Sequence, residues 1–182
     1  MRRILLVVLL VCLADPASAA AWSWPVDGPV LRPFLFGDDP YAAGQHRGVD
    51  VGAPAGAPVR APASGTVAFA GTVPRGGRTL TIETADGYSV TLVHLGSVSP
   101  ARGATVLEGQ PVGTIGPSGD PEWNEPYVHL GVRVTADRHG YVDPLLFLPA
   151  RGEQIGAPDD PAASPAGIDA APGPTPAEAA HA

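Results

Sequence analysis

Residues 79–94 read TLTIETADGYSVTLVH, and this stretch decides the fold class. Two runs of alternating apolar and polar residues flank Ala85-Asp86-Gly87. An Asp-Gly pair between such runs is among the strongest short-range signals for a β-hairpin. The alternation places His94 on the same strand face as Val90 and Leu92. At the end of this apolar row, the alternation alone favours a buried, hydrogen-bonded structural histidine.

Similar short runs continue on both sides of the hairpin. They are punctuated by glycine (23 residues) and proline (22 residues), a composition typical of many turns and little helix. No segment shows a convincing amphipathic helical period. We therefore expect an all-β domain, a compact barrel or sandwich of short antiparallel strands. The expected strands are at residues 30–34, 59–62, 65–70, 79–84, 88–94 and 126–134, with two more short strands around a tight turn within residues 105–116. The strand at residues 126–134 has Tyr127, His129, Gly131 and Arg133 on one face.

The N-terminus has the pattern of a secretory signal peptide over residues 1–19. Two arginines precede an apolar run from Ile4 to Leu13, and small residues follow at Ala17-Ser18-Ala19. The run is too short for a stable transmembrane helix. We expect an exported protein with no transmembrane segment after cleavage. Val11 is bulkier than the residue that usually precedes a lipidated cysteine, which disfavours a lipid anchor at Cys12.

The remainder divides into a folded domain and a tail. The expected domain covers residues 20–150. From 151 to 182 the sequence is rich in alanine and proline, is acidic, and has few large apolar residues. Such a composition does not offset the entropy cost of ordering, so we expect residues 151–182 to be a disordered tail.

Charge and composition exclude several function classes. The formal charge of −7 and the absence of basic runs argue against nucleic acid or an anionic membrane as the main partner. All 11 basic residues are arginine. Residues 61–67 and 106–110 suggest a carrier-like barrel-sandwich domain, which presents a lysine for biotin or lipoate. Without lysine, the chain cannot carry either group. Schiff-base chemistry and P-loop phosphate binding are excluded for the same reason.

A candidate metal site begins at His46 and Asp50. Together with His129 they form a His2Asp set, which suits Zn²⁺ and leaves a fourth position for water, as a catalytic site requires. In an extended strand, residues four apart are separated by about 13 Å, so the backbone must bend between His46 and Asp50. We expect Gly48 to permit the bend. The alternative for this pair alone is a surface loop with two polar side chains.

Six short motifs in order resemble the lysostaphin or LytM-type zinc metalloendopeptidases, across about residues 24–148. They are His46 to Val51, Pro58 to Val67, Val93-His94-Leu95, Gly109 to Gly113, Val128-His129-Leu130 and Val142-Asp143-Pro144. The resemblance implies a β-rich duplicated hybrid motif and cleavage of peptide bonds in peptidoglycan. It also implies that His46, Asp50 and His129 bind Zn²⁺.

The resemblance assigns catalytic roles to His94 and to the position of Tyr127. His94 matches the histidine that polarises water or stabilises the transition state. The remaining catalytic histidine of the family stands where this chain has Tyr127. Tyrosine has an unperturbed pKa near 10, so it is a poor base at neutral pH, but its hydroxyl can donate to an oxyanion. Glu122 and Glu125 are candidates for a substitute base.

Two hypotheses follow. The first is an exported, cell-wall-associated zinc endopeptidase, expected to be a monomer, whose substrate is peptidoglycan peptide. The second is a degenerate member that binds wall peptide or regulates another cell-wall hydrolase. The intact ligand set favours the first, and Tyr127 favours the second.

Overall fold

The structure is a computed structural model and describes residues 22–151 of the chain. The expected signal peptide at residues 1–19 lies outside the described residues, as does the expected tail after residue 151. The described strands are β1 (Val30–Arg32), β2 (Val49–Gly52), β3 (Pro58–Arg60), β4 (Gly65–Val73), β5 (Gly77–Glu83), β6 (Tyr88–Val98), β7 (Thr105–Val106), β8 (Pro111–Ile115), β9 (Tyr127–Val134) and β10 (Tyr141–Val142).

The expected all-β fold of short antiparallel strands is confirmed. Every strand pairing is antiparallel. Within residues 22–151 the single helical element is a 3-10 turn, η1 (Pro144–Leu146). In the same range no helix is long and apolar enough to cross a membrane.

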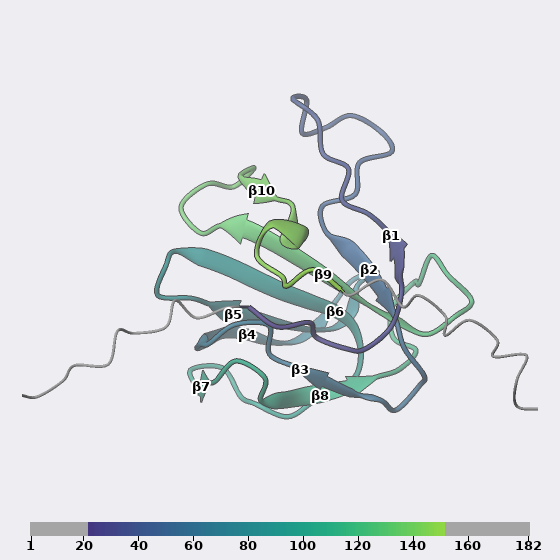
Figure 1. Ribbon diagram of the computed structural model, residues 1–182, viewed down its shortest axis with the longest axis vertical. Coiled ribbons are helices and arrows are strands. Elements are labelled where there is room, and N and C mark those ends of the chain that lie inside the picture. Colours follow the sequence, from purple (N-terminus) through teal and green to yellow (C-terminus); the bar gives the residue numbers. More distant parts are fainter. Residues whose placement is uncertain (1–21, 152–182) are drawn as a thin grey trace, which may run out of the picture. The chain divides into compact units, whose positions relative to one another are not determined.

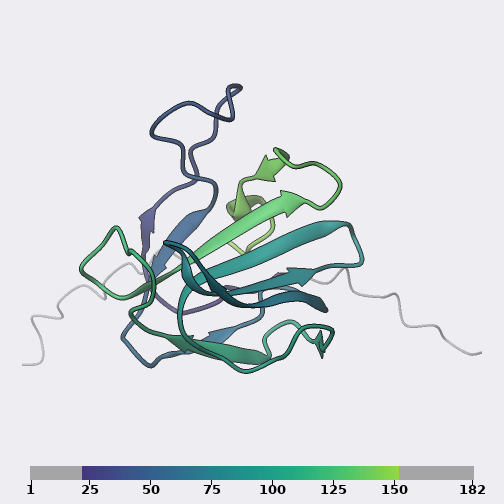
Figure 2. The same cartoon turned by 180° about the vertical axis from the view of Figure 1, so that it is seen from behind.

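One long strand, β6, connects the two parts of the sheet. The strand order is β1-β2-β9-β6-β5-β4-β7, and β8 pairs with both β3 and β6. The first part of β6 lies between β5 and β9, whereas its last residues pair with β8. Figures 1 and 2 show β3 and β8 as a lower layer beneath β5, β6 and β9. Over the described residues the strand path ends at β1 and β7, so the sheet folds over itself without closing.

The core lies between these layers. Val59 of β3, Ile115 of β8, Leu92 of β6 and Leu130 of β9 are almost completely buried and belong to one apolar cluster. Removal of this apolar surface from water is the main driving force for such a fold. The candidate site can therefore occupy the opposite face of β9 without disturbing the core.

The β5–β6 hairpin forms at the predicted residues. Leu80 pairs with Leu92 and Ile82 with Val90, and the turn residue Gly87 has a positive φ of 83°. Only glycine adopts this backbone region freely, which explains the Asp-Gly sequence.

The expected orientation of His94 is wrong. Between the pairs Leu80–Leu92 and Arg78–Leu95, β6 has two residues opposite one residue of β5. This β-bulge gives His94 a φ of 64°, and Leu95 takes the buried place in the apolar row. His94 is only partly buried, and its ring packs against that of Tyr127.

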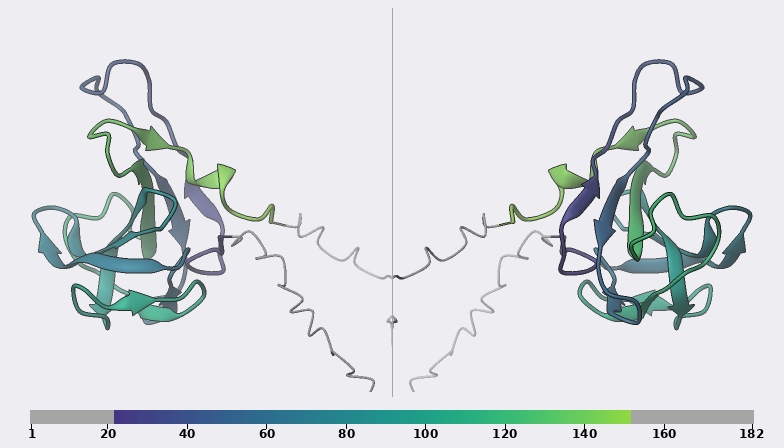
Figure 3. Two further views of the ribbon diagram at one scale, coloured as in Figure 1. Left: turned by 90° about the vertical axis from the view of Figure 1, so that its left-hand side faces the viewer. Right: turned by 90° about the vertical axis from the view of Figure 1, so that its right-hand side faces the viewer.

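The connection between β1 and β2 extends beyond the sheet (Figure 3). An isolated antiparallel bridge joins Leu35 to His46 at the base of this connection. The backbone N–H of each residue donates to the carbonyl of the other. His46 is therefore fixed at the edge of the sheet, immediately before β2 begins.

Candidate metal centre

Adjacent strands hold Asp50 and His129 side by side. Asp50 of β2 and His129 of β9 are direct partners in the antiparallel register. Side chains of such a pair leave the sheet on the same side. The Nδ1 atom of His129 lies 2.8 Å from Oδ1 of Asp50.

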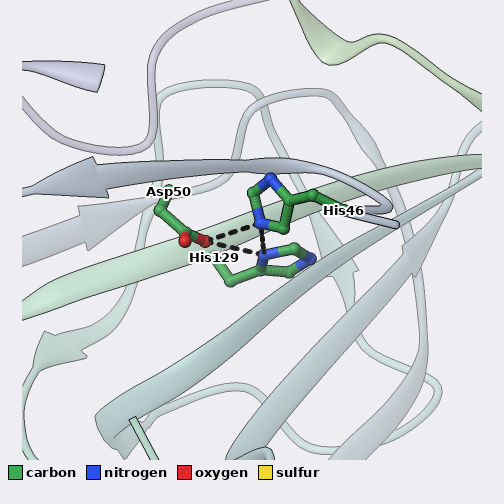
Figure 4. Close-up of side chains that lie close together, drawn as sticks. All are labelled: His46, Asp50 and His129. Carbon is green, nitrogen blue, oxygen red and sulfur yellow. Dashed lines mark hydrogen bonds and ion pairs between the residues drawn. The ribbon is translucent and has the colours of Figure 1, made fainter. Parts of the chain in front are cut away.

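His46 completes the cluster from the loop before β2. Its Nε2 atom lies 3.2 Å from Oδ1 of Asp50 and 3.2 Å from Nδ1 of His129 (Figure 4). Its Nδ1 lies 2.7 Å from the carbonyl oxygen of Pro33, to which it donates. A proton on Nδ1 leaves the Nε2 lone pair directed at the other two side chains, as in many metal-binding histidines.

Gly48 is required for a different reason from the one expected. Its φ is not in the left-handed region, so the bend after His46 does not depend on glycine's backbone freedom. A Cβ atom at this position would come within 3.0 Å of the Leu130 carbonyl oxygen and 2.7 Å from Nε2 of His129. The absent side chain allows β2 and β9 to approach and gives space to the His129 ring.

The three side chains fit a zinc ion. Their ligand atoms all lie within 4.8 Å of one another, and the pairwise distances are 2.8–3.2 Å. Ligand atoms at about 2.1 Å from a tetrahedral ion are separated by about 3.4 Å, which is close to this arrangement. Two imidazoles and one carboxylate match the donor preference of Zn²⁺. These residues would hold the ion and leave one coordination position for water or substrate.

The electrostatics of the cluster favour a cation. Burial acts to raise the pKa of the Asp50 carboxyl, but without a metal, when His129 and His46 are protonated at the nitrogens that face it, their hydrogen bonds outweigh burial and hold this pKa well below its ordinary value. Burial acts to lower the pKa of His46, yet its hydrogen bonds to Asp50 and to the Pro33 carbonyl raise it. The cluster therefore keeps a buried negative charge and stabilises a positive one beside it.

Trp123 also contacts the cluster, although no sequence pattern identified it as a site residue. Its indole Nε1 donates to Oδ2 of Asp50 at 3.2 Å, the carboxylate oxygen that does not face the histidines. The loop that carries Trp123 is held by an ion pair between Glu122 and Arg32 of β1. Because this loop has no periodic pattern, only the fold could bring the indole to Asp50.

Tyr127 lies two residues before His129 on the same face of β9. It is 3% exposed, and its hydroxyl oxygen accepts a hydrogen bond from the backbone N–H of Glu122 at 3.1 Å. Burial raises the pKa of the Tyr127 hydroxyl, the Glu122 hydrogen bond opposes this, and the negative charges of Asp50 and Glu122 add to the rise. The hydroxyl therefore keeps its proton at neutral pH and is a donor rather than a base.

His94 packs against Tyr127. The centroids of the two rings are 5.0 Å apart. Nδ1 of His94 lies 3.0 Å from the carbonyl oxygen of Ser118 and donates to it. In the neutral ring, Nε2 is then the nitrogen that can accept a proton.

The two candidate glutamates are placed differently. Glu122 borders the site through its backbone, but its carboxylate is paired with Arg32. Glu125 lines a separate surface hollow with Gly28, Gly52 and Pro126. Neither carboxylate belongs to the metal-binding cluster of the described residues.

Comparison with known proteins identifies the family. A model described as peptidase family M23 matches residues 44–144, which is more than half of the 182-residue chain. The chain belongs to peptidase family M23. The M23 match begins just before His46 and ends at Pro144, so it includes every candidate site residue. The resemblance to lysostaphin and LytM-type enzymes is confirmed at the level of the family.

Curated M23 relatives are longer than this chain. The lipoprotein YgeR of Escherichia coli K12, itself described as uncharacterized, is 30% identical over 140 residues, which are 76% of this chain and 51% of YgeR. The cell division protein DipM of Caulobacter vibrioides is 33% identical over 133 residues, 70% of this chain and 21% of DipM. The murein hydrolase activator NlpD of Salmonella typhimurium is 29% identical over 136 residues, 74% of this chain and 33% of NlpD. The chain thus spans about half or less of these relatives.

Solved structures share the fold of the M23 region. A zinc-containing peptidase from Vibrio cholerae has a TM-score of 0.56 and 28% identity, covering 68% of this chain and 39% of that one. The catalytic domain of lysostaphin from Staphylococcus simulans has a TM-score of 0.55 and 28% identity, covering 66% of this chain and 89% of that domain. M23 proteins similar to this chain therefore include peptidases and, by name, an activator of murein hydrolases.

Proposed function

We propose that this chain is an exported zinc metalloendopeptidase that hydrolyses peptide bonds in bacterial peptidoglycan. The observation that carries the proposal is the convergence of Nε2 of His46, Oδ1 of Asp50 and Nδ1 of His129 in an M23 domain. A protein that only scaffolds has no chemical need for such a donor set. The chain spans about half or less of the length of its relatives. The activity of the whole protein is therefore also part of this proposal.

The cluster would bind Zn²⁺ through His46, Asp50 and His129. When bound, the ion supplies Lewis acidity that polarises a carbonyl group and favours ionisation of water. The hydrogen bonds that His46 donates to the Pro33 carbonyl and that Trp123 donates to Asp50 orient the ligands before the ion arrives. Preorganisation of this kind lowers the cost of binding.

His94 and Tyr127 supply the proton chemistry. With Nδ1 bonded to the Ser118 carbonyl, Nε2 of His94 accepts a proton from the attacking water. The Tyr127 oxygen accepts from the Glu122 N–H, which leaves the hydroxyl hydrogen to be donated to the oxyanion of the tetrahedral intermediate. In this arrangement the tyrosine stabilises charge and the histidine moves the proton.

The test combines metal analysis with a wall-digestion assay. The mature protein, residues 20–182, should bind about one equivalent of zinc and release amino groups from purified sacculi. The His129→Ala variant should lose both properties. His139→Ala is the matched control, because His139 lies outside the cluster and contacts Tyr41. If the zinc-loaded wild type releases no amino groups across a range of pH, the endopeptidase proposal fails.

A second candidate function is favoured by Tyr127. In this version the domain keeps the fold and the metal but binds wall peptide or activates another hydrolase, as the name of NlpD states for that protein. A Tyr127→His variant that gains lytic activity, starting from an inactive wild type, would support it. Strong wild-type activity that is abolished by His129→Ala would remove it.

A further inference from the structure

A hollow of about 370 Å³ adjoins the metal-binding cluster on the outer face of the sheet. Its floor is formed by paired residues of β6 and β9, with His129 opposite Val93 at one end and Arg133 opposite Ser89 at the other. Four residues of a strand span about 13 Å, so the hollow is long enough for one residue of a peptide and its side chain. It begins at a ligand of the candidate zinc site.

Gly131 keeps the middle of this floor open. It lies between His129 and Arg133 on β9, opposite Thr91. A Cβ atom there would lie 3.3 Å from the Arg47 carbonyl oxygen and 3.6 Å from Nε2 of His129. Because Gly131 lines the hollow, a larger side chain there would take up part of its volume.

Two arginines, Arg47 and Arg133, line the hollow and bring positive charge to it. One nitrogen of Arg47 donates to the Pro40 carbonyl, and the guanidinium lies over the rings of Phe36 and Tyr141, 5.6 and 5.5 Å from their centroids. The Nη1 atom of Arg133 donates to the carbonyls of Val134, Thr135 and Asp137 in and beside the β9–β10 turn. Each guanidinium is thus held in place while its other nitrogens remain available as donors.

Neither arginine has a carboxylate partner in the part of the chain that the structure describes. Among residues 22–151, the ion pairs are Arg32 with Glu122 and the two histidines with Asp50. The chain as a whole is acidic, with a net charge of −7. Two guanidiniums without a carboxylate partner therefore give this hollow a positive charge, opposite in sign to that of the chain. A partly buried guanidinium is stabilised by an anion, and its fork geometry matches a carboxylate.

We propose that this hollow is the substrate subsite beside the metal centre, and that it selects a peptide residue with a free carboxylate through Arg47 and Arg133. The inference rests on the proposed function in one respect, because it takes the occupant to be a peptide bound for hydrolysis. It adds the substrate class, an acidic peptide rather than one whose carboxylates are amidated.

The test measures binding and cleavage separately in the same samples. Two fluorescein-labelled stem peptides are used that differ only in a side-chain carboxylate or its primary amide. Fluorescence anisotropy with the zinc-loaded mature protein gives the dissociation constants, and mass spectrometry reports cleavage. We expect the acidic peptide to bind about 10- to 100-fold more tightly, the usual effect of a charge-assisted hydrogen bond.

Variants assign the preference to the two arginines. Arg47→Gln should remove most of it, and Arg133→Lys should reduce it while keeping the charge that holds the β9–β10 turn. Arg60→Gln is the matched control, because Arg60 is exposed and also donates to a single backbone carbonyl, that of Gly109. Circular dichroism verifies that each variant is folded.

The outcomes separate this inference from the proposed function. Equal affinity for the two peptides overturns the subsite even if both are cleaved. A preference that survives both Arg47→Gln and Arg133→Lys, or that Arg60→Gln removes equally, overturns the assignment to these arginines. A preference that is lost only in the hollow variants supports the subsite even if no cleavage is detected.

Discussion

At the scale of single residues, the proposed role of the Tyr127 hydroxyl as an oxyanion donor can be tested directly. Its raised pKa and its buried position make it a permanent donor. Tyr127→Phe removes the donor and keeps the ring that packs on His94. We expect kcat for release of amino groups from sacculi to fall about 10²- to 10³-fold, as for loss of one oxyanion donor.

The zinc content separates this effect from damage to the metal site. Tyr127 contacts none of the three ligand side chains through a hydrogen bond, so Tyr127→Phe should bind zinc like the wild type. A loss of zinc in parallel with the loss of activity would contradict the assigned role.

Trp123 tests how far orientation of Asp50 contributes to metal affinity. Trp123→Phe removes the N–H donor to Oδ2 of Asp50 and retains an aromatic ring in the loop. Loss of such an outer contact typically weakens metal binding about 10- to 100-fold. Competition with a chromophoric zinc chelator measures the change. Trp24→Phe is the control, because it loses an indole hydrogen bond to Pro149, away from the cluster.

At the scale of the elements, the site depends on the approach of β2 to β9. We expect Gly48→Ala to destabilise the protein by about 1–3 kcal/mol, since its methyl group would overlap the Leu130 carbonyl and the His129 ring. It should also weaken zinc binding by displacing His129. Urea denaturation of the zinc-free protein measures the first effect. Gly37→Ala is the control, because a Cβ atom there contacts nothing within 4 Å.

The strands themselves were predictable from the sequence, and the irregular parts of the site were not. Alternation identified the β5–β6 hairpin and the site-bearing face of β9, because one face of each strand must be apolar. The bulge at His94 interrupts that alternation, and nothing in the local sequence marks it. The contact between Trp123 and Asp50 joins residues 73 positions apart, so it follows from tertiary structure alone.

Spacing predicted the cluster only with help from the resemblance. His46 and Asp50 are close in sequence, but His129 is brought to them by the pairing of β2 with β9. The requirement for glycine at position 48 was predicted for a local bend, whereas its physical cause is a neighbouring strand. A single sequence shows local constraints well and close approaches between strands poorly.

At the scale of the whole molecule, the core stabilises the sheet, and we expect an ion at the candidate metal centre to add to its stability. The core residues Leu92 and Leu130 are completely buried between the layers, so we expect the fold to form without the ion. The ion would join the loop at His46, strand β2 and strand β9. Metal removal should therefore lower stability without unfolding the domain.

Thermal melting gives the last prediction. At a free zinc concentration of about 100 times Kd, binding to the native state alone adds about 2.7 kcal/mol, which corresponds to a rise in Tm of about 10 °C for a domain of this size. Addition of a chelator should reverse this rise and leave a cooperative transition. In His129→Ala, zinc and chelator should have little effect on Tm, because one ligand is missing. A zinc-free protein that melts without cooperativity would show instead that the ion, and not the core between β3, β8 and β9, maintains the fold.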